Sequence, residues 1–362
     1  MENTCIYWKS DADLTFNKKE HVFPAGIGCK TTLPKGYVSD KANEETSILE
    51  AELLRETLAL PRIFEGPGKR GSLSVEKQTK SDVCIAVDEL DEVQLAYISL
   101  GKPYPIIQIH KRGILLSVSS PNQNIDYDTK PIIDDLFNRL ETFHNPFVFI
   151  ESKRLEEGEC IFGFYNNKQY YAAKTKQTLE RIKDQINEIK SIKNSFEQAF
   201  LSPKSSHISC DMFFIMTERT NRAVAKIACN TAAYCFGNTF LLNPCFDDIR
   251  SYIVEGTKTT DYVSFVQIDD IKNEIDLMPH KSHWCLITKY GMNLIAVVCF
   301  YNHFAFQVLL SDCCHTNVQP NGFICNWKRK KDYKLYEFLS LLSSDEKNEI
   351  SKQNRVPFEP ST

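Results

Sequence analysis

The N-terminal fold is decided by two stretches of the chain, Lys18-Lys19-Glu20-His21-Val22-Phe23-Pro24 and Asp40-Lys41-Ala42-Asn43-Glu44. In them an acidic residue stands directly before a histidine, and an asparagine follows 22 positions after that histidine. This spacing indicates a compact unit in which one strand ends at His21, a long loop leads to a second strand, and a helix begins near Asn43.

Glu20, His21 and Asn43 together suit the hydrolysis of a phosphodiester bond. That reaction needs a nucleophilic water, stabilisation of charge on the phosphate and help for the leaving oxygen, and a single Mg²⁺ (or Mn²⁺) supplies the last two. Carboxylate and amide oxygens are ligands for such an ion, and a histidine has a pKa suited to deprotonating the water. Neighbouring residues of a strand point to opposite faces, so Glu20 and His21 meet at one site only where the strand bends or ends. A chance Glu-His pair and an asparagine that caps a helix remain the structural alternatives.

Residues 5–71 resemble the HNH endonuclease superfamily, in the zinc-knuckle branch that includes phage endonuclease VII. Members show Cys-x-x-Cys, then Asp- or Glu-His-x-x-Pro, then Gly-Gly, and last Cys-x-x-Cys-Asn. The resemblance implies a ββα-metal nuclease that cuts nucleic acid, with DNA as the expected partner, His21 as the catalytic base, and Glu20 and Asn43 as metal ligands. The corresponding segments of this chain are Cys5-Ile6-Tyr7-Trp8, Glu20-His21-Val22-Phe23-Pro24, Gly28-Cys29 and Ser39-Asp40-Lys41-Ala42-Asn43.

The chain departs from this family at the zinc knuckle. Three of the four zinc cysteines are replaced, by Trp8, Ser39 and Ala42, so no structural zinc is expected and packing of the helix is expected to hold the loop instead. The loss leaves open a second interpretation, in which a decayed HNH module acts as a nucleic-acid-binding or scaffold subunit. Retention of Glu20, His21 and Asn43 favours the active enzyme.

Basic residues follow the first helix that the pattern predicts. Apolar residues recur at helical spacing from Asn43 to position 60, and Pro61 is expected to end that helix. Arg62, Lys69 and Arg70 then lie in or beside a glycine-rich loop, which lets a phosphate approach the backbone. We expect these three cations to contact nucleic acid, with a solvated surface turn as the alternative.

The composition is that of an ordinary globular protein. The 362 residues are 42% hydrophobic and 25% charged, and the net charge of −4 carries no global basic signature. The chain has no apolar run of about 18 residues and no signal-peptide pattern, so we expect a cytoplasmic protein with no membrane partner. The 13 cysteines are expected to be reduced core residues, because Cys313-Cys314-His315 with Cys325 matches no standard zinc spacing.

The remaining pattern predicts an α+β fold, in which the N-terminal ββα-metal HNH unit is followed by a mixed α/β body with a largely antiparallel sheet. We expect a nuclease domain at 1–75, a mixed middle region at 76–203 and a C-terminal α+β region at 204–362. A long helix at 174–201 carries a narrow apolar seam, which suits either packing on its own core or contact with a second copy or partner subunit. The long C-terminal extension resembles those of some bacterial HNH proteins, a resemblance that implies a role in anti-phage defence.

Local signals predict further elements. Apolar patterns indicate strands at 6–8, 16–23, 284–288, 294–300 and 305–310, and Asn166-Asn167 is expected to form a turn between two strands. A helix is expected from Thr220 to Phe236, ending at Gly237, and His283 is expected to be a structural histidine.

Overall fold

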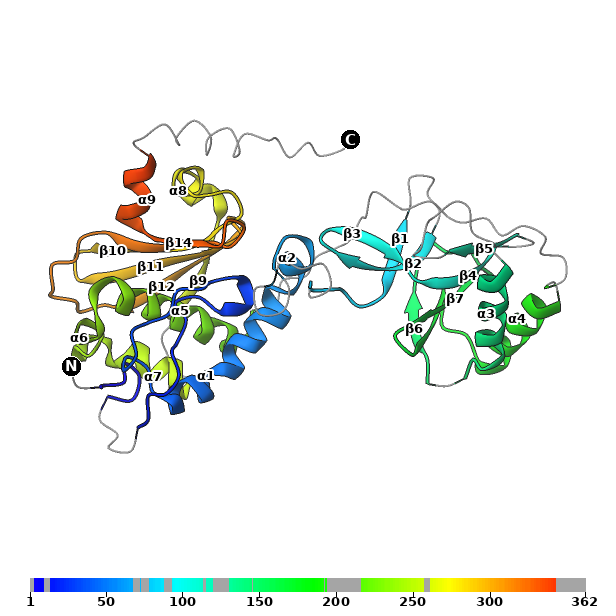
Figure 1. The fold of residues 1–362 in the computed structure, drawn as a ribbon, viewed down its shortest axis with the longest axis horizontal. Coiled ribbons are helices and arrows are strands. Elements are labelled where there is room, and N and C mark those ends of the chain that lie inside the picture. Colours follow the sequence, from blue (N-terminus) through cyan, green and yellow to red (C-terminus); the bar gives the residue numbers. More distant parts are fainter. Residues whose placement is uncertain are drawn as a thin grey trace. The chain divides into compact units, whose positions relative to one another are not determined.

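The computed structural model describes residues 3–9, 14–67, 72, 78–87, 93–112, 115–119, 130–144, 146–191, 193, 216–256 and 261–342. Its helices and mostly antiparallel sheets confirm the α+β class (Figure 1). The chain divides into two compact units, one made of residues 1–79 with 213–362 and the other of residues 80–212. The first and third expected regions therefore belong to one unit, and the middle region corresponds closely to the other.

The first unit is built on a six-stranded antiparallel sheet with the strand order β14-β13-β10-β11-β12-β9. The strands β10, β11 and β12 confirm those expected at 284–288, 294–300 and 305–310, and most of their residues are buried. The strands are β9 (Val263–Val266), β10 (His283–Tyr290), β11 (Asn293–Phe300), β12 (Phe304–Ser311), β13 (Asn321–Asn326) and β14 (Lys331–Lys334).

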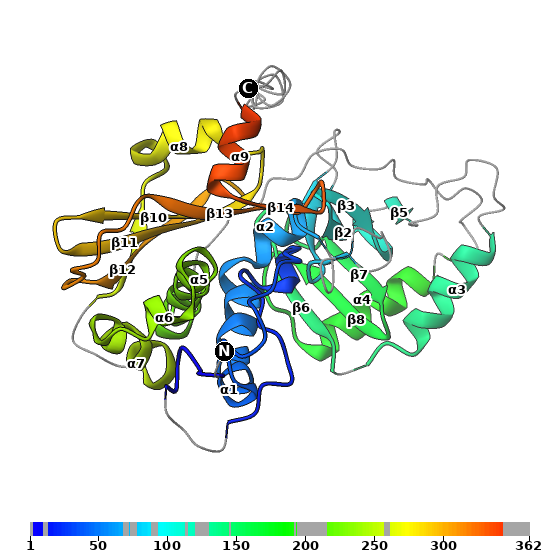
Figure 2. The same cartoon turned by 60° about the vertical axis from the view of Figure 1, so that its left-hand side comes forward.

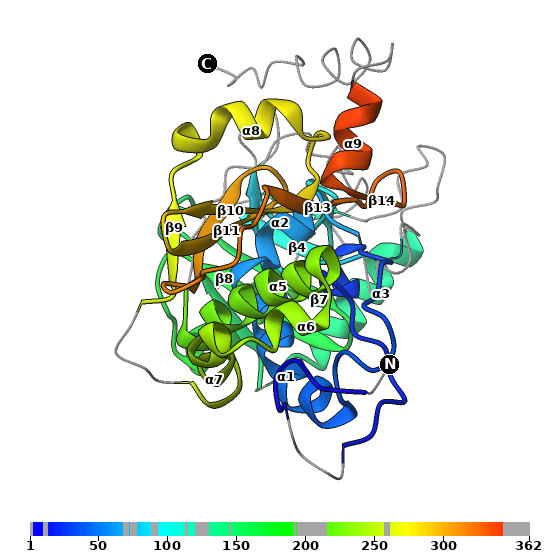
Figure 3. The same cartoon turned by 90° about the vertical axis from the view of Figure 1, so that its left-hand side faces the viewer.

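Both faces of this sheet are covered by helices. Helix α5 (Glu218–Phe236) lies on one face, and α8 (Lys272–Leu277) and α9 (Leu335–Leu342) lie on the other (Figures 2 and 3). Alternate residues of a strand pack into the apolar clusters on opposite faces of the sheet. Trp284 packs toward α9 and its neighbour Cys285 toward α5.

Helix α5 ends before Gly237 as expected, but it begins at Glu218, two residues before the expected start at Thr220. Thr217 and Thr220 form a capping box at its start, and Gly237, with φ +90°, stops it. Shorter helices follow, α6 (Asn238–Leu241), the 3₁₀ turn η6 (Pro244–Phe246) and α7 (Asp247–Glu255), and a 3₁₀ turn η7 (Ile268–Ile271) precedes α8.

The N-terminal segment packs into the same core as α5. Among residues 3–9 and 14–39 the structure has a 3₁₀ turn η1 (Ala25–Ile27) but no regular strand, so the strands expected before His21 reduce to a short antiparallel pairing. The helix begins three residues earlier than expected, because Ser39 rather than Asn43 caps α1 (Asp40–Glu52).

Pro61 does not end the helical segment, contrary to expectation. A π-helical turn η2 (Leu53–Thr57) follows α1, and a second helix α2 (Ala59–Phe64) begins after Leu58. Pro61 lies in the first turn of α2, where a residue without an N–H group removes no helical hydrogen bond.

The second unit contains a three-stranded sheet, β1-β2-β3, and a five-stranded sheet, β5-β4-β7-β8-β6. All strand pairs are antiparallel except β6 with β8, and Asn166 and Asn167, at φ +49° and +58°, make the tight turn expected between β7 and β8. The elements are β1 (Cys84–Val87), β2 (Val93–Ser99), β3 (Lys102–Pro105), β4 (Ile107–Arg112), β5 (Leu115–Ser119), α3 (Lys130–Glu141), β6 (Val148–Glu151), β7 (Cys160–Tyr165), β8 (Lys168–Ala173) and α4 (Leu179–Ser191).

The apolar seam of the long expected helix packs within its own unit. Ile182, Ile186 and Ile189 of α4 are buried in one core with α3 and the five-stranded sheet. The three isoleucines therefore already pack inside their own unit. The part of the expected helix from 194 to 201 lies outside the described residues. In the portion of the chain that is described, no helix is both long and apolar enough to cross a membrane.

Candidate functional site

His21 lies in a short antiparallel pairing that leads into α1. The backbone of Val22 donates to the carbonyl of Thr31 at 3.1 Å, Leu33 donates to the carbonyl of Glu20 at 2.7 Å, and His21 and Thr32 form the bridge between them. The tight 3₁₀ turn η1 lies within the loop that joins the two segments. One isolated bridge with its flanking backbone hydrogen bonds therefore precedes the helix, and Asn43 lies in the first turn of that helix.

Glu20 points into the interior, whereas His21 is only half-buried. Glu20 Oε1 accepts a hydrogen bond from Lys226 Nζ at 2.7 Å and another from Asn230 Nδ2 at 3.3 Å, both on α5. Lys226, 1% exposed, also binds the carboxylate of Glu50 on α1. Asn230 in turn accepts a hydrogen bond from the Tyr7 hydroxyl at 2.7 Å, so the whole group is one buried network.

Partial burial favours the neutral form of the His21 imidazole. Partial burial lowers the pKa of His21 from 6.5, because the charged imidazolium loses hydration. The carboxylates of Glu50 and Asp332 act in the opposite direction but do not reverse the shift. A neutral imidazole of lowered pKa is the form that accepts a proton from water.

The expected divalent site at Glu20 and Asn43 does not fit the residues as they are arranged. One oxygen of Glu20 is held by an ammonium and an amide, and the carboxyl group is 6% exposed. A divalent ion at that oxygen would lie beside the Lys226 charge, in an interior where such repulsion is strong. No chemical step is therefore assigned to a metal at this position.

Cys5 and Ser39, at two of the positions compared with the zinc-knuckle cysteines, form a hydrogen-bonded pair. The backbone N–H and the hydroxyl of Ser39 lie 3.4 and 3.3 Å from Cys5 Sγ. Ala42, at the other replaced cysteine position of the second pair, is fully buried and its N–H donates to the Ser39 hydroxyl. The segment around Cys5 and the start of α1 are thus held together by these hydrogen bonds.

Arg62 supports the helices rather than presenting an open cation. Its Nη1 donates to the carbonyl of Leu54 at 3.0 Å, and burial lowers the pKa of the guanidinium. Lys69 and Arg70, expected beside it as phosphate contacts, lie outside the described residues.

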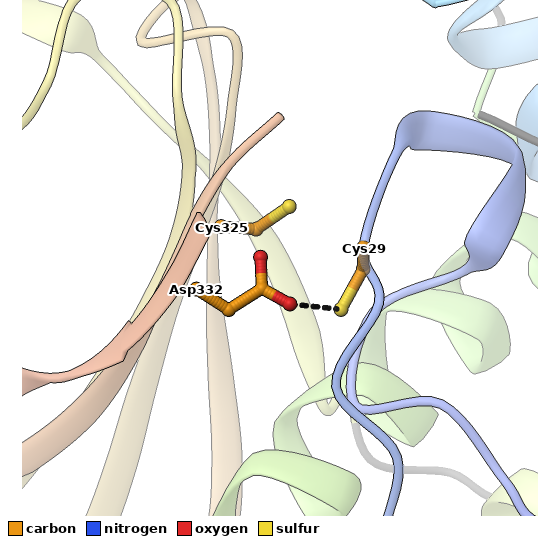
Figure 4. A group of neighbouring side chains, drawn as sticks. All are labelled: Cys29, Cys325 and Asp332. Carbon is orange, nitrogen blue, oxygen red and sulfur yellow. Dashed lines mark hydrogen bonds between the residues drawn. The ribbon is translucent and has the colours of Figure 1, made fainter. Parts of the chain in front are cut away.

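Three further polar side chains meet where the N-terminal loop reaches the sheet. Cys29, from the segment after η1, lies close to Cys325 of β13 and Asp332 of β14 (Figure 4), and one potential ligand atom from each falls within 4.8 Å of the other two. All described cysteines are free thiols. Burial raises the pKa of the Cys325 thiol well above its usual value, since a thiolate there would be poorly hydrated.

Sequence reasoning missed Lys226 and Asp332, although one signal was present. Lys226 interrupts an apolar run of small residues in the middle of α5, and a lysine in such a run needs a buried partner. Its partner Glu20 stands 206 positions away, a pairing that no local pattern reveals.

The structural interpretation of His283 is confirmed. This histidine is fully buried, with Nε2 3.2 Å from the carbonyl of Ile27 and Nδ1 accepting from the N–H of Tyr301. Burial lowers its pKa to about 3, so it stays neutral and holds the N-terminal turn on the sheet.

No protein-family model, curated protein or solved structure matches this chain. The resemblance to HNH endonucleases therefore rests on the quoted residues alone.

Proposed function

We propose that the chain is an HNH-type endonuclease, which hydrolyses phosphodiester bonds of nucleic acid with His21 as the general base. One observation carries the proposal: His21 forms the bridge between two paired extended segments that lead directly into a helix with Asn43 in its first turn. This order of pairing, loop and helix is the arrangement that the resemblance implies.

Two features of the site support a base at this position. The lowered pKa of His21 keeps the imidazole neutral at pH 7, and its partial exposure leaves it open to water and to a substrate. Ser39, held against Cys5, begins α1 and so places the first turn of the helix relative to the paired segments.

The test is cleavage of plasmid DNA by the purified protein, with Mg²⁺, with Mn²⁺ and with EDTA, beside the variant His21→Ala. Loss of a general base lowers the rate by roughly 10²–10⁴-fold, so nicking should fall to background in this variant. His315→Ala, which removes an exposed histidine of the same unit, is the matched control and should cut at the parent rate. Undiminished cutting by His21→Ala contradicts the assignment, provided that circular dichroism shows all three proteins folded.

The ion pair at Glu20 favours a second function, that of a decayed HNH module which binds nucleic acid without cutting it. Glu20 and Lys226 are nearly fully buried and bind each other, which gives Glu20 a structural role in place of a metal-binding one. Binding of DNA in a gel-retardation assay, with no cutting under any metal condition, would support this function over the enzyme.

A further inference from the structure

The group formed by Cys29, Cys325 and Asp332 joins the N-terminal loop to the edge of the sheet. Cys29 is 3% exposed and Cys325 is fully buried, and Cys29 Sγ lies 3.7 Å from Asp332 Oδ2. Cys325 and Asp332 face each other as register partners on β13 and β14, so a rigid pair of strands holds two of the three side chains.

The carboxylate of Asp332 is held from one side only. Its Oδ2 accepts hydrogen bonds from the N–H of Lys30 at 3.0 Å, and from the N–H and the hydroxyl of Thr31, both at 2.8 Å. Its Oδ1 is buried and accepts no hydrogen bond from the described residues. In Figure 4 this second oxygen points away from Cys29, on the side of Cys325. A buried carboxylate oxygen without a partner is costly unless something binds it.

We propose that Cys29 Sγ, Cys325 Sγ and Asp332 Oδ1 bind one Zn²⁺ ion, with a water molecule in the fourth position. Tetrahedral zinc with ligands at about 2.0–2.3 Å places those ligands roughly 3.5–3.8 Å apart. One atom from each of the three side chains, including one carboxylate oxygen, already lies within 4.8 Å of the other two. These separations would therefore have to shorten by at most about 1.3 Å to reach this geometry.

The chemistry of the donors selects the metal. Two sulfurs and one carboxylate oxygen suit zinc, whereas Mg²⁺ requires oxygen ligands and near-octahedral geometry. Both thiols lose their protons to solvent when the ion binds, and the resulting three negative charges are largely balanced by Zn²⁺. The hydrogen bonds from the Lys30–Thr31 segment to Oδ2 orient the carboxylate in the way that outer groups commonly orient metal ligands.

The zinc proposal does not depend on the nuclease proposal, although the Asp332 carboxylate also acts on the pKa of His21. The ion would fasten the loop that follows η1 to the sheet. Sequence spacing cannot reveal it, because Cys29 and Cys325 are 296 positions apart.

The experiment is a metal titration of the full-length protein, purified under reducing conditions and stripped with a chelator. Zinc content after titration and dialysis, measured by mass spectrometry, should reach one ion per chain. Titration with Co²⁺ should give a sulfur-to-cobalt charge-transfer band together with the visible absorption of a tetrahedral site. In Asp332→Asn the affinity should fall roughly tenfold or more, and Cys29→Ser and Cys325→Ser should lose the charge-transfer intensity of one thiolate each.

The matched control is Cys313→Ser, which changes an exposed cysteine of the same unit and should leave zinc content and cobalt spectrum unchanged. The cobalt spectrum of the wild-type protein tests the site even where a variant fails to fold. Absence of any sulfur-to-cobalt band in the folded wild-type protein overturns the site. So does a Cys29–Cys325 disulfide found by peptide mapping in protein prepared without reductant and with zinc present.

Discussion

Among the described residues of the first unit, Lys226 has the least exposed charge, at 1%, and it lies between Glu20 and Glu50. Burial acts to lower the pKa of Lys226, but the two carboxylates outweigh it and the pKa is raised, so the ammonium remains charged. Its role is to neutralise carboxylates brought inside by the N-terminal segment and by α1.

Removing that charge should destabilise the first unit strongly. Lys226→Met keeps most of the volume but leaves Glu20 buried without a counter-charge, so the free energy of unfolding should fall by on the order of 3–5 kcal/mol. Lys9→Met is the control, because the ion pair of Lys9 with Asp247 is largely solvated and should contribute about 0–1 kcal/mol. Urea unfolding measures both, and equal losses in the two variants would show that the buried network does not behave as described.

The pH dependence of cleavage should report the environment of His21. Burial lowers the pKa of His21 below 6.5. The imidazole therefore becomes protonated, and stops acting as a base, only at pH values below 6.5. We expect kcat/KM for plasmid nicking to rise with pH at pH values below 6.5 and to level off above it. Measurement between about pH 5 and 8 checks this, with DNA binding followed over the same range. An acid limb centred above pH 6.5 would point to another group as the base.

At the scale of elements, the turn η1 is joined to the sheet by a close approach at Gly28. This glycine has φ +99°, and a Cβ atom there would lie 2.6 Å from Cβ of Trp327, at the end of β13. The contact positions Cys29, the next residue, beside Asp332. Only glycine, which has no side chain, can both adopt this positive φ without strain and lie this close to Trp327.

Gly28→Ala should therefore lower the free energy of unfolding by more than the strained backbone alone would. The left-handed backbone costs about 1–2 kcal/mol, and the clash with Trp327 adds about 1–3 kcal/mol. Gly291→Ala is the matched variant, because Gly291 also has a positive φ, +61°, but has no atom within 4 Å of the added Cβ. Denaturant unfolding of both variants gives the difference, and a difference near zero would mean that Trp327 moves aside freely.

At the scale of the whole molecule, the chain leaves the first unit near residue 79 and returns to it near residue 213. Each unit has apolar clusters of its own, with Leu294 in the core of the first and Leu136 in the core of the second. Units with separate cores are expected to unfold as separate cooperative blocks.

Calorimetry should accordingly resolve two transitions. Leu136→Ala and Leu294→Ala each remove a fully buried side chain and should destabilise their own unit by about 2–5 kcal/mol. Each variant should lower the midpoint temperature of one transition and leave that of the other unchanged. A single transition that both variants shift equally would show that the units unfold together.

The elements that were predicted correctly have strong local signals. Helix α5 ends at Gly237 and the turn at Asn166 and Asn167 joins two apolar strands, and both follow from the conformations open to a few neighbouring residues. The N-terminal strands were predicted wrongly, because the pattern from 16 to 23 also suits an extended segment that binds the rest of the unit through side chains.

The sequence by itself determined the α+β class, most of the central strands and the helices with clear caps, since hydrophobic period and capping act over a few residues. Only the tertiary structure decided what the polar side chains do. Glu20 binds Lys226 and Cys29 meets Asp332 across more than 200 positions of sequence. A polar group is costly to bury without a partner, and the partner can come from any part of the sequence. Which residues become partners depends on the packing of the whole unit.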